Sequence, residues 1–113
     1  MKVMTKSQAK ELKLDSSCSA IEYEMGDKDI NVAIIFINGR SPTSGRVVNS
    51  ICKEMAYVMK GSGKILIEDK EIVLNQGDMI IIDPGERYFW NGNMTLFVPC
   101  APAWEVTQSK LVK

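Results

Sequence analysis

The sequence contains no histidine, which removes the side chain most often used to bind metals and to move protons near neutral pH. It has three cysteines, Cys18, Cys52 and Cys100, but no CxxC pair. This odd number without pairing argues against a disulfide scaffold and against a structural zinc site. We therefore expect free thiols in a cytoplasmic protein.

Long apolar runs and an excess of one charge are also absent. Lys and Arg number 14, as do Asp and Glu, so no net field favours nucleic acid or an anionic membrane. No run approaches the roughly 20 apolar residues of a membrane span, and the first residues lack the apolar stretch of a signal peptide. We expect a soluble protein with neither nucleic-acid nor membrane partners.

The length of 113 residues and the apolar fraction of 45% predict a single domain with one core. We expect an extension over residues 1–18, a barrel over 19–100 and a tail over 101–113 that packs on the barrel or on a partner. Within the extension, residues 5–14 fit either a short helix that begins at Thr5 or an irregular segment.

From Ser19 onward, short apolar segments are separated by Gly, Asp, Asn and Pro, which is typical of a β-barrel or sandwich. The connections at 60–63, 68–70, 75–78 and 91–93 have the composition of tight turns. The connection at 68–70 leaves no room for a helical crossover, so a parallel α/β sheet is excluded. The predicted fold class is all-β.

Two stretches of the sequence resemble the cupin motifs. Glu54 is followed by a glycine at Gly61, as in the first motif, and Gly77 leads through an apolar strand to Gly85, as in the second. The two stretches cover about a third of the chain. By this resemblance, the whole chain is identified as a small, single-domain, RmlC-like cupin with a jelly-roll β-barrel.

The chain departs from the family at the metal ligands. The family's histidines would fall at residues 47–50, which read Val-Val-Asn-Ser, and at Tyr88. Of the usual metal donors only Glu54 is left, and one carboxylate without imidazoles does not assemble the family's metal site. We therefore expect no metal and no other cofactor.

Strand alternation places Ser50, Cys52, Glu54 and Ala56 on one face, which the resemblance makes the barrel interior. A buried Glu without a cation should have a raised pKa, which suits a general acid or base, although a hydrogen-bonded structural Glu fits equally. Tyr88 is a candidate donor of a proton or hydrogen bond into the same cavity, with packing as the alternative.

Four other residues are candidates for the walls and mouth of this cavity. Trp90 is an aromatic wall, and Cys52 shares the face of Glu54 but has no base to activate its thiol. Arg46 and Arg87 suit a carboxylate or phosphate at the mouth, with solvated charge as the alternative. The predicted catalytic pair is Glu54 and Tyr88, and the predicted ligand-binding residues are Ser50, Cys52, Glu54, Tyr88, Trp90, Arg46 and Arg87.

Three functions are compatible with these residues. The first is metal-free binding of a small organic ligand, such as a sugar or an organic acid, in the barrel. The second is a metal-independent isomerase or epimerase with Glu54 and Tyr88 as acid and base. The third is an acetate kinase-like activity, implied by a resemblance to the cupins of ethanolamine utilisation over residues 54–61 and 97–104, although the chain lacks a GxxxxGK loop.

A homodimer is the expected assembly. Residues 30–37 form a segment that is apolar at nearly every position and therefore apolar on both faces of a strand. The resemblance points the same way, because small cupins commonly pair through outer sheet faces.

Overall fold

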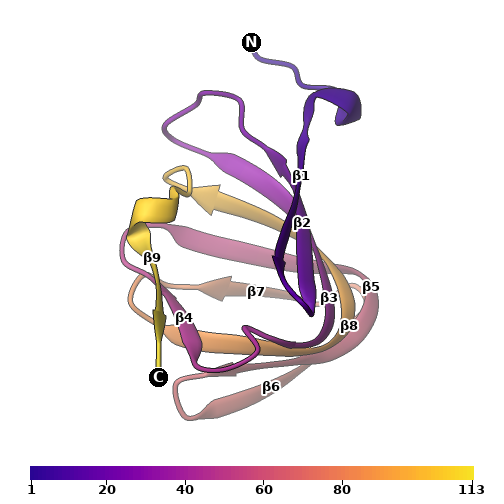
Figure 1. Ribbon diagram of the computed structural model, residues 1–113, viewed down its shortest axis with the longest axis vertical. Coiled ribbons are helices and arrows are strands. Elements are labelled where there is room, and N and C mark those ends of the chain that lie inside the picture. Colours follow the sequence, from indigo (N-terminus) through magenta and orange to yellow (C-terminus); the bar gives the residue numbers. More distant parts are fainter.

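The structure is a computed structural model that describes residues 1–113 and consists almost entirely of β-strands (Figure 1). This confirms the all-β prediction. Two 3-10 turns, η1 (Lys6–Gln8) and η2 (Val106–Gln108), lie near the two ends of the chain. Neither turn is long and apolar enough to cross a membrane. The strands are β1 (Lys10–Asp15), β2 (Cys18–Tyr23), β3 (Asn31–Ser41), β4 (Arg46–Asn49), β5 (Lys53–Ile67), β6 (Lys70–Asn75), β7 (Met79–Ile82), β8 (Arg87–Ala101) and β9 (Ser109–Val112).

The two longest strands, β5 and β8, have 15 residues each and pair with one another along most of their length. Around one half of this pair the strand order is β1-β2-β3-β8-β5-β7, which we call the first half-sheet. Around the other half it is β9-β4-β8-β5-β6, the second half-sheet. Figure 1 shows the whole sheet curled, so that the two halves enclose a common interior.

The bend between the half-sheets falls where Gly63 of β5 pairs with Gly92 of β8 and Gly61 pairs with Met94. Gly61 has a φ of 84°, and a Cβ atom added to it would overlap the backbone oxygen of Asn93. A Cβ atom on Gly92 would lie 2.5 Å from the Cα atom of Gly63. Glycine is required here because the two backbones approach too closely for any side chain.

Two of the four predicted turns are therefore wrong. The segments 60–63 and 91–93 lie inside β5 and β8, which run through them as bent strands. Their glycines serve a close approach between two backbones instead of a chain reversal. The other two predictions, at 68–70 and 75–78, are confirmed as the connections β5–β6 and β6–β7.

Neither alternative predicted for residues 5–14, a short helix or an irregular segment, holds beyond the first turn. The cap at Thr5 is present, since its backbone N–H donates to the side-chain oxygen of Gln8 at 2.8 Å. Only η1 follows, because residues 10–15 form β1 and pair with β2, with Leu12 opposite Ala20. The sheet thus begins within the segment that we expected to be an extension.

The tail lies against the barrel. Its strand β9 pairs with β4, and Trp104 packs against the buried core. The indole N–H of Trp104 donates to the side-chain oxygen of Asn49 at 3.1 Å. The core lies between the half-sheets, and each of its fully buried aliphatic side chains contributes about 1.5–3 kcal/mol. The largest of these side chains are Ile37, Ile65, Leu96 and Val58.

Candidate functional site

Glu54 and Tyr88 meet across the barrel interior. Glu54 belongs to the first half-sheet, where it pairs with Cys100 of β8, whereas Tyr88 belongs to the second, where it pairs with Ile67 of β5. The Tyr88 hydroxyl donates a hydrogen bond to Oε2 of Glu54 at 3.0 Å. Both residues are buried, with exposed fractions of 7% and 5%. The two motif residues predicted as a pair are therefore in direct contact.

The environment separates the proton affinities of these two groups. Burial raises the pKa of Glu54 above its ordinary value of 4.5, while hydrogen bonds from Tyr88 and Cys100 act in the opposite direction. Burial, reinforced by the nearby Glu54, raises the pKa of Tyr88 well above 10. Tyr88 therefore keeps its proton, and Glu54 is the group that titrates. Such a carboxyl is a general acid when protonated and a general base when ionised.

Two thiols lie beside this carboxyl. Cys100 points its Sγ at Oε1 of Glu54 with a separation of 3.8 Å, and Cys52, which directly precedes β5, is buried. Burial raises the pKa of both thiols, and the charge of Glu54 raises them further. Because a thiolate is the reactive form, Cys52 is a poor nucleophile and serves as a wall residue.

Trp90 completes the interior wall next to Tyr88. The two rings meet edge to face, with centroids 6.2 Å apart and an interplanar angle of 78°. Trp90 is buried, as predicted for an aromatic wall. In register it pairs with Ser41 of β3, so the aromatic pair borders a further group of polar residues.

That polar group consists of Ser41, Asp15 and Cys18, which sequence reasoning missed. The buried Ser41 hydroxyl donates to Oδ2 of Asp15 at 2.9 Å. Burial raises the pKa of the Cys18 thiol, while its hydrogen bond with Ser41 acts the other way. The charges of Asp15 and Glu54 both raise it as well, so Cys18 is influenced by both carboxyls.

Cys100 was also missed, although a signal for it exists. Alternation along β8 puts Met94, Leu96, Val98 and Cys100 on the buried face together with Tyr88 and Trp90. Extending the period of two from Tyr88 by six steps would have placed Cys100 in the interior. Its pairing with Glu54 is a matter of register and leaves no trace in the sequence.

Ser50 does not belong to the interior. It is exposed, and its hydroxyl donates to the backbone oxygen of Gln108 at 3.2 Å. The predicted alternation fails at this point because β4 ends at Asn49 and β5 begins at Lys53. The bend between the two strands breaks the period on which the placement of Ser50 rested.

Arg46 and Arg87 lie together but outside the barrel. Arg87 binds the Glu68 carboxylate at 2.8 Å, and Arg46 donates to the Glu68 backbone oxygen. Alternation explains this position, since Arg87 is the neighbour of the inward-facing Tyr88. With Asp69 and Lys113 they line a charged hollow of about 430 Å³ on the second half-sheet. The prediction that they border the cavity of Glu54 is wrong.

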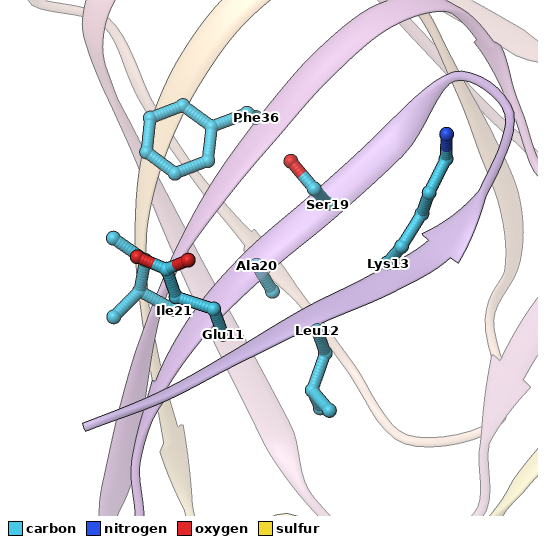
Figure 2. Close-up of a pocket in the computed structure, with 7 residues that line it drawn as sticks. All are labelled: Glu11, Leu12, Lys13, Ser19, Ala20, Ile21 and Phe36. Atoms are coloured by element: carbon cyan, nitrogen blue, oxygen red, sulfur yellow. The ribbon is translucent and has the colours of Figure 1, made fainter. Parts of the chain in front are cut away.

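A second hollow, of about 410 Å³, lies on the outer surface of β1, β2 and β3. Figure 2 shows Phe36 and Ser19 on one side of these strands, with Leu12 and Ala20 turned to the other. Glu11, Lys13 and Ile21 complete its lining. It is part of the outer face of the first half-sheet and is separate from the Glu54 interior.

The chain offers few metal donors. Among its Cys, Asp and Glu side chains, no group of three or more is arranged to hold a metal ion. In the interior, Glu54 is accompanied by Cys52 and Cys100, whose raised pKa values keep them protonated.

Comparison with known proteins finds likeness in structure alone. No protein-family model and no curated protein matches the sequence. Streptomyces Pac13, a nucleoside dehydratase, matches with a TM-score of 0.89 and 17% identity over 100% of this chain and 92% of its own. An RmlC-like cupin from Shewanella frigidimarina matches with a TM-score of 0.74 and 16% identity, over 90% of this chain and 91% of its own. KdgF from Halomonas matches with a TM-score of 0.71 and 10% identity, over 91% of this chain and 94% of its own.

Proposed function

We propose that this chain, which has the cupin fold, binds a small hydroxyl-bearing ligand such as a sugar or nucleoside in its barrel, without a histidine-bound metal. The observation that carries the proposal is the hydrogen bond from Tyr88 to Glu54 across the interior. A carboxylic acid and a phenol offer donors and acceptors to hydroxyl groups, and Trp90 offers an aromatic face to a sugar or base. Structures of Pac13 with uridine support this ligand class by analogy of fold.

A second function, metal-independent proton transfer in an isomerase or epimerase, is favoured by the raised pKa of Glu54. Ionised Glu54 would take a proton from a carbon next to a carbonyl group and return it to a neighbouring carbon or to the opposite face. Tyr88 would donate a hydrogen bond to the carbonyl oxygen, where negative charge develops. No observation favours the acetate kinase-like activity.

Thermal unfolding with a panel of nucleosides, sugars, sugar acids and organic acids tests the binding proposal. A ligand at 100 times its Kd stabilises the protein by about 2.7 kcal/mol, which raises the Tm of a domain of this size by several degrees. We expect Glu54→Gln and Tyr88→Phe to lose this shift. The matched control Glu71→Gln, on the exposed surface of β6, should keep it.

An equal shift in Glu54→Gln and in the unchanged protein would place the ligand elsewhere and overturn the proposal. The far-ultraviolet circular dichroism of each variant, measured without ligand, separates a lost site from a lost fold.

We also propose that a second copy of the chain covers the outer face of the first half-sheet. Five apolar side chains form an unbroken row across its strands, each paired in register with the next. Six large apolar side chains on this face have exposed fractions between 36% and 55%. The row is Ile21, Ile34, Phe97, Tyr57 and Met79, and the six are Phe36, Tyr57, Met59, Met79, Ile81 and Phe97.

The area and charge of this face favour a second copy as its partner. If a large side chain has a surface of roughly 200 Å², the six side chains together expose on the order of 500 Å². This is most of the about 800 Å² that each partner buries in a standard interface. The centre of this face is an uncharged apolar row that can pack against the same row of a second copy, as a two-fold interface requires, and the net charge of zero adds no repulsion. Charged side chains lie beside this row: Glu11 and Lys13 on β1, and the ion pair between Lys53 and Asp83. The outer face of the second half-sheet carries two ion pairs, Lys64–Glu71 and Arg87–Glu68. We place this dimer in the cytoplasm, which the three free cysteines support.

A further inference from the structure

The Glu54 site is closed to solvent. Glu54, Tyr88, Cys52 and Cys100 have exposed fractions of 7%, 5%, 1% and 6%. If this site binds a ligand, as proposed above, part of the chain has to move aside before the ligand can enter. The element that moves should adjoin the site and should be weakly held.

Residues 102–113 meet both conditions, and we propose that this segment, the strap, is a removable cover that opens to admit ligand to the Glu54 site. In Figure 1 it runs from η2 along β4, on the side of the barrel opposite the bend of β5 and β8. Its strand β9 covers the free edge of β4. Strand β4 itself is joined to β8 at only two register pairs, Val47 with Tyr88 and Val48 with Arg87.

Gln108 fastens the strap to the chain segment that leads into the site. Its side-chain oxygen accepts hydrogen bonds from the backbone N–H groups of Ile51 at 3.1 Å and of Cys52 at 2.8 Å. Its backbone oxygen accepts one from the N–H of Ser50 at 3.1 Å. Cys52 lies two residues before Glu54 on the same face of the chain, so the strap covers the approach to the carboxyl.

Trp104 fastens the beginning of the strap. Its indole N–H donates to Asn49, its backbone N–H donates to the Asn31 side chain at 2.9 Å, and its carbonyl oxygen accepts from the same side chain at 3.1 Å. The ring packs against the core from a partly buried position. Side chains of β3 and β4 thus hold the strap without a continuous backbone ladder at this point.

The strap buries too little apolar surface to be held as firmly as the core. Gln108, a polar residue, is its only buried residue. Val106 and Leu111 are 73% and 66% exposed, so they contribute little to docking. Segments with few buried apolar contacts open at a lower free energy than the whole fold. The strap should therefore open while β5 and β8 stay paired.

Labelling of the cysteines by N-ethylmaleimide, with each site read by peptide mass, tests the strap under native conditions. Gln108→Ala removes the acceptor of two hydrogen bonds, from Ile51 and Cys52. We expect Cys52 to be labelled about tenfold faster or more, because the loss of a single buried hydrogen bond already gives a factor of about ten. Cys18 pairs in β2 with β1 and β3, away from the strap, and its rate should not change. Trp104→Ala should act as Gln108→Ala does.

Val106→Ala is the matched control, because Val106 lies in the same segment but is exposed. It should leave all three labelling rates unchanged. Two results would overturn the proposal. Equally faster labelling of Cys18 and Cys52 would mean that the whole fold opens. Unchanged labelling of Cys52 in both strap variants would mean that the cover does not open. Faster labelling of Cys52 with no ligand found in the panel would sink the proposed function alone.

Discussion

Glu54 is the only ionisable carboxyl among the buried residues of the protein, and it has no cation beside it. A buried carboxylate without a counter-charge is costly, so the folded state holds the proton of Glu54 more tightly than the unfolded chain does. Between the unfolded value of 4.5 and the raised folded value, the folded protein therefore binds more protons. Stability falls as the pH rises through this window.

We expect Glu54→Gln to remove this dependence, since an amide has the shape of the protonated acid but does not ionise. The difference in free energy of unfolding between the variant and the unchanged protein should grow by up to about 1.4 kcal/mol for each pH unit above 4.5, and should level off above the folded pKa. Urea unfolding at pH 4 to 8 measures it. A constant difference across this range would contradict the raised pKa.

The interior residues illustrate which site features a sequence can predict. Motif spacing and strand alternation found Glu54, Tyr88, Cys52 and Trp90, because both depend on neighbours along the chain. The contact of Cys100 with Glu54 joins residues 46 positions apart, and it depends on the register between β5 and β8. Sequence reasoning without that register had no means to find it.

At the level of the strands, the bend of β5 against β8 shows why two turns were predicted wrongly. A glycine-rich segment is favoured both at a turn and where two backbones come close. Gly61 meets Asn93 across the bend, and that partner is 32 positions away in the sequence. The turns at 68–70 and 75–78 were predictable because each reverses the chain within its own residues.

A comparison of Gly61→Ala with Gly77→Ala separates the two reasons for glycine, which are a positive φ and the close approach of another backbone. Both residues have positive φ, of 84° and 92°, but Gly77 has no atom within 4 Å of an added Cβ. Gly77→Ala should cost about 1–2 kcal/mol of unfolding free energy from backbone strain alone. Gly61→Ala should cost about 1–3 kcal/mol more, because its Cβ meets backbone. Equal losses in urea unfolding would show that the close approach is unimportant.

For the whole molecule, the contrast between its two outer faces sets the expected assembly. The unchanged protein should have twice its chain mass of 12.6 kDa in sedimentation at micromolar concentration. A charge placed in the apolar row by Phe97→Lys or Met79→Lys should yield the monomer, since a lysine buried in an interface lacks a partner. Val73→Lys, at an exposed position on the second half-sheet, should leave the dimer intact.

A monomer of the unchanged protein under these conditions would refute the dimer. A dimer that survives both row substitutions but dissociates with Val73→Lys would move the interface to the second half-sheet.

Strands β5 and β8 build the barrel interior with one face and the outer apolar row with the other, as Glu54 and Tyr57 illustrate. A shift of the alternation by one residue along either strand would exchange these faces, turning the carboxyl outward and the apolar row inward. An inserted residue avoids this exchange where it forms a β-bulge, as β5 does between Val58 and Lys60. The number of residues in these strands is therefore more tightly constrained than the identity of any one side chain. Substitutions on either face are therefore compatible with the fold, whereas changes in length are best accommodated in the connections.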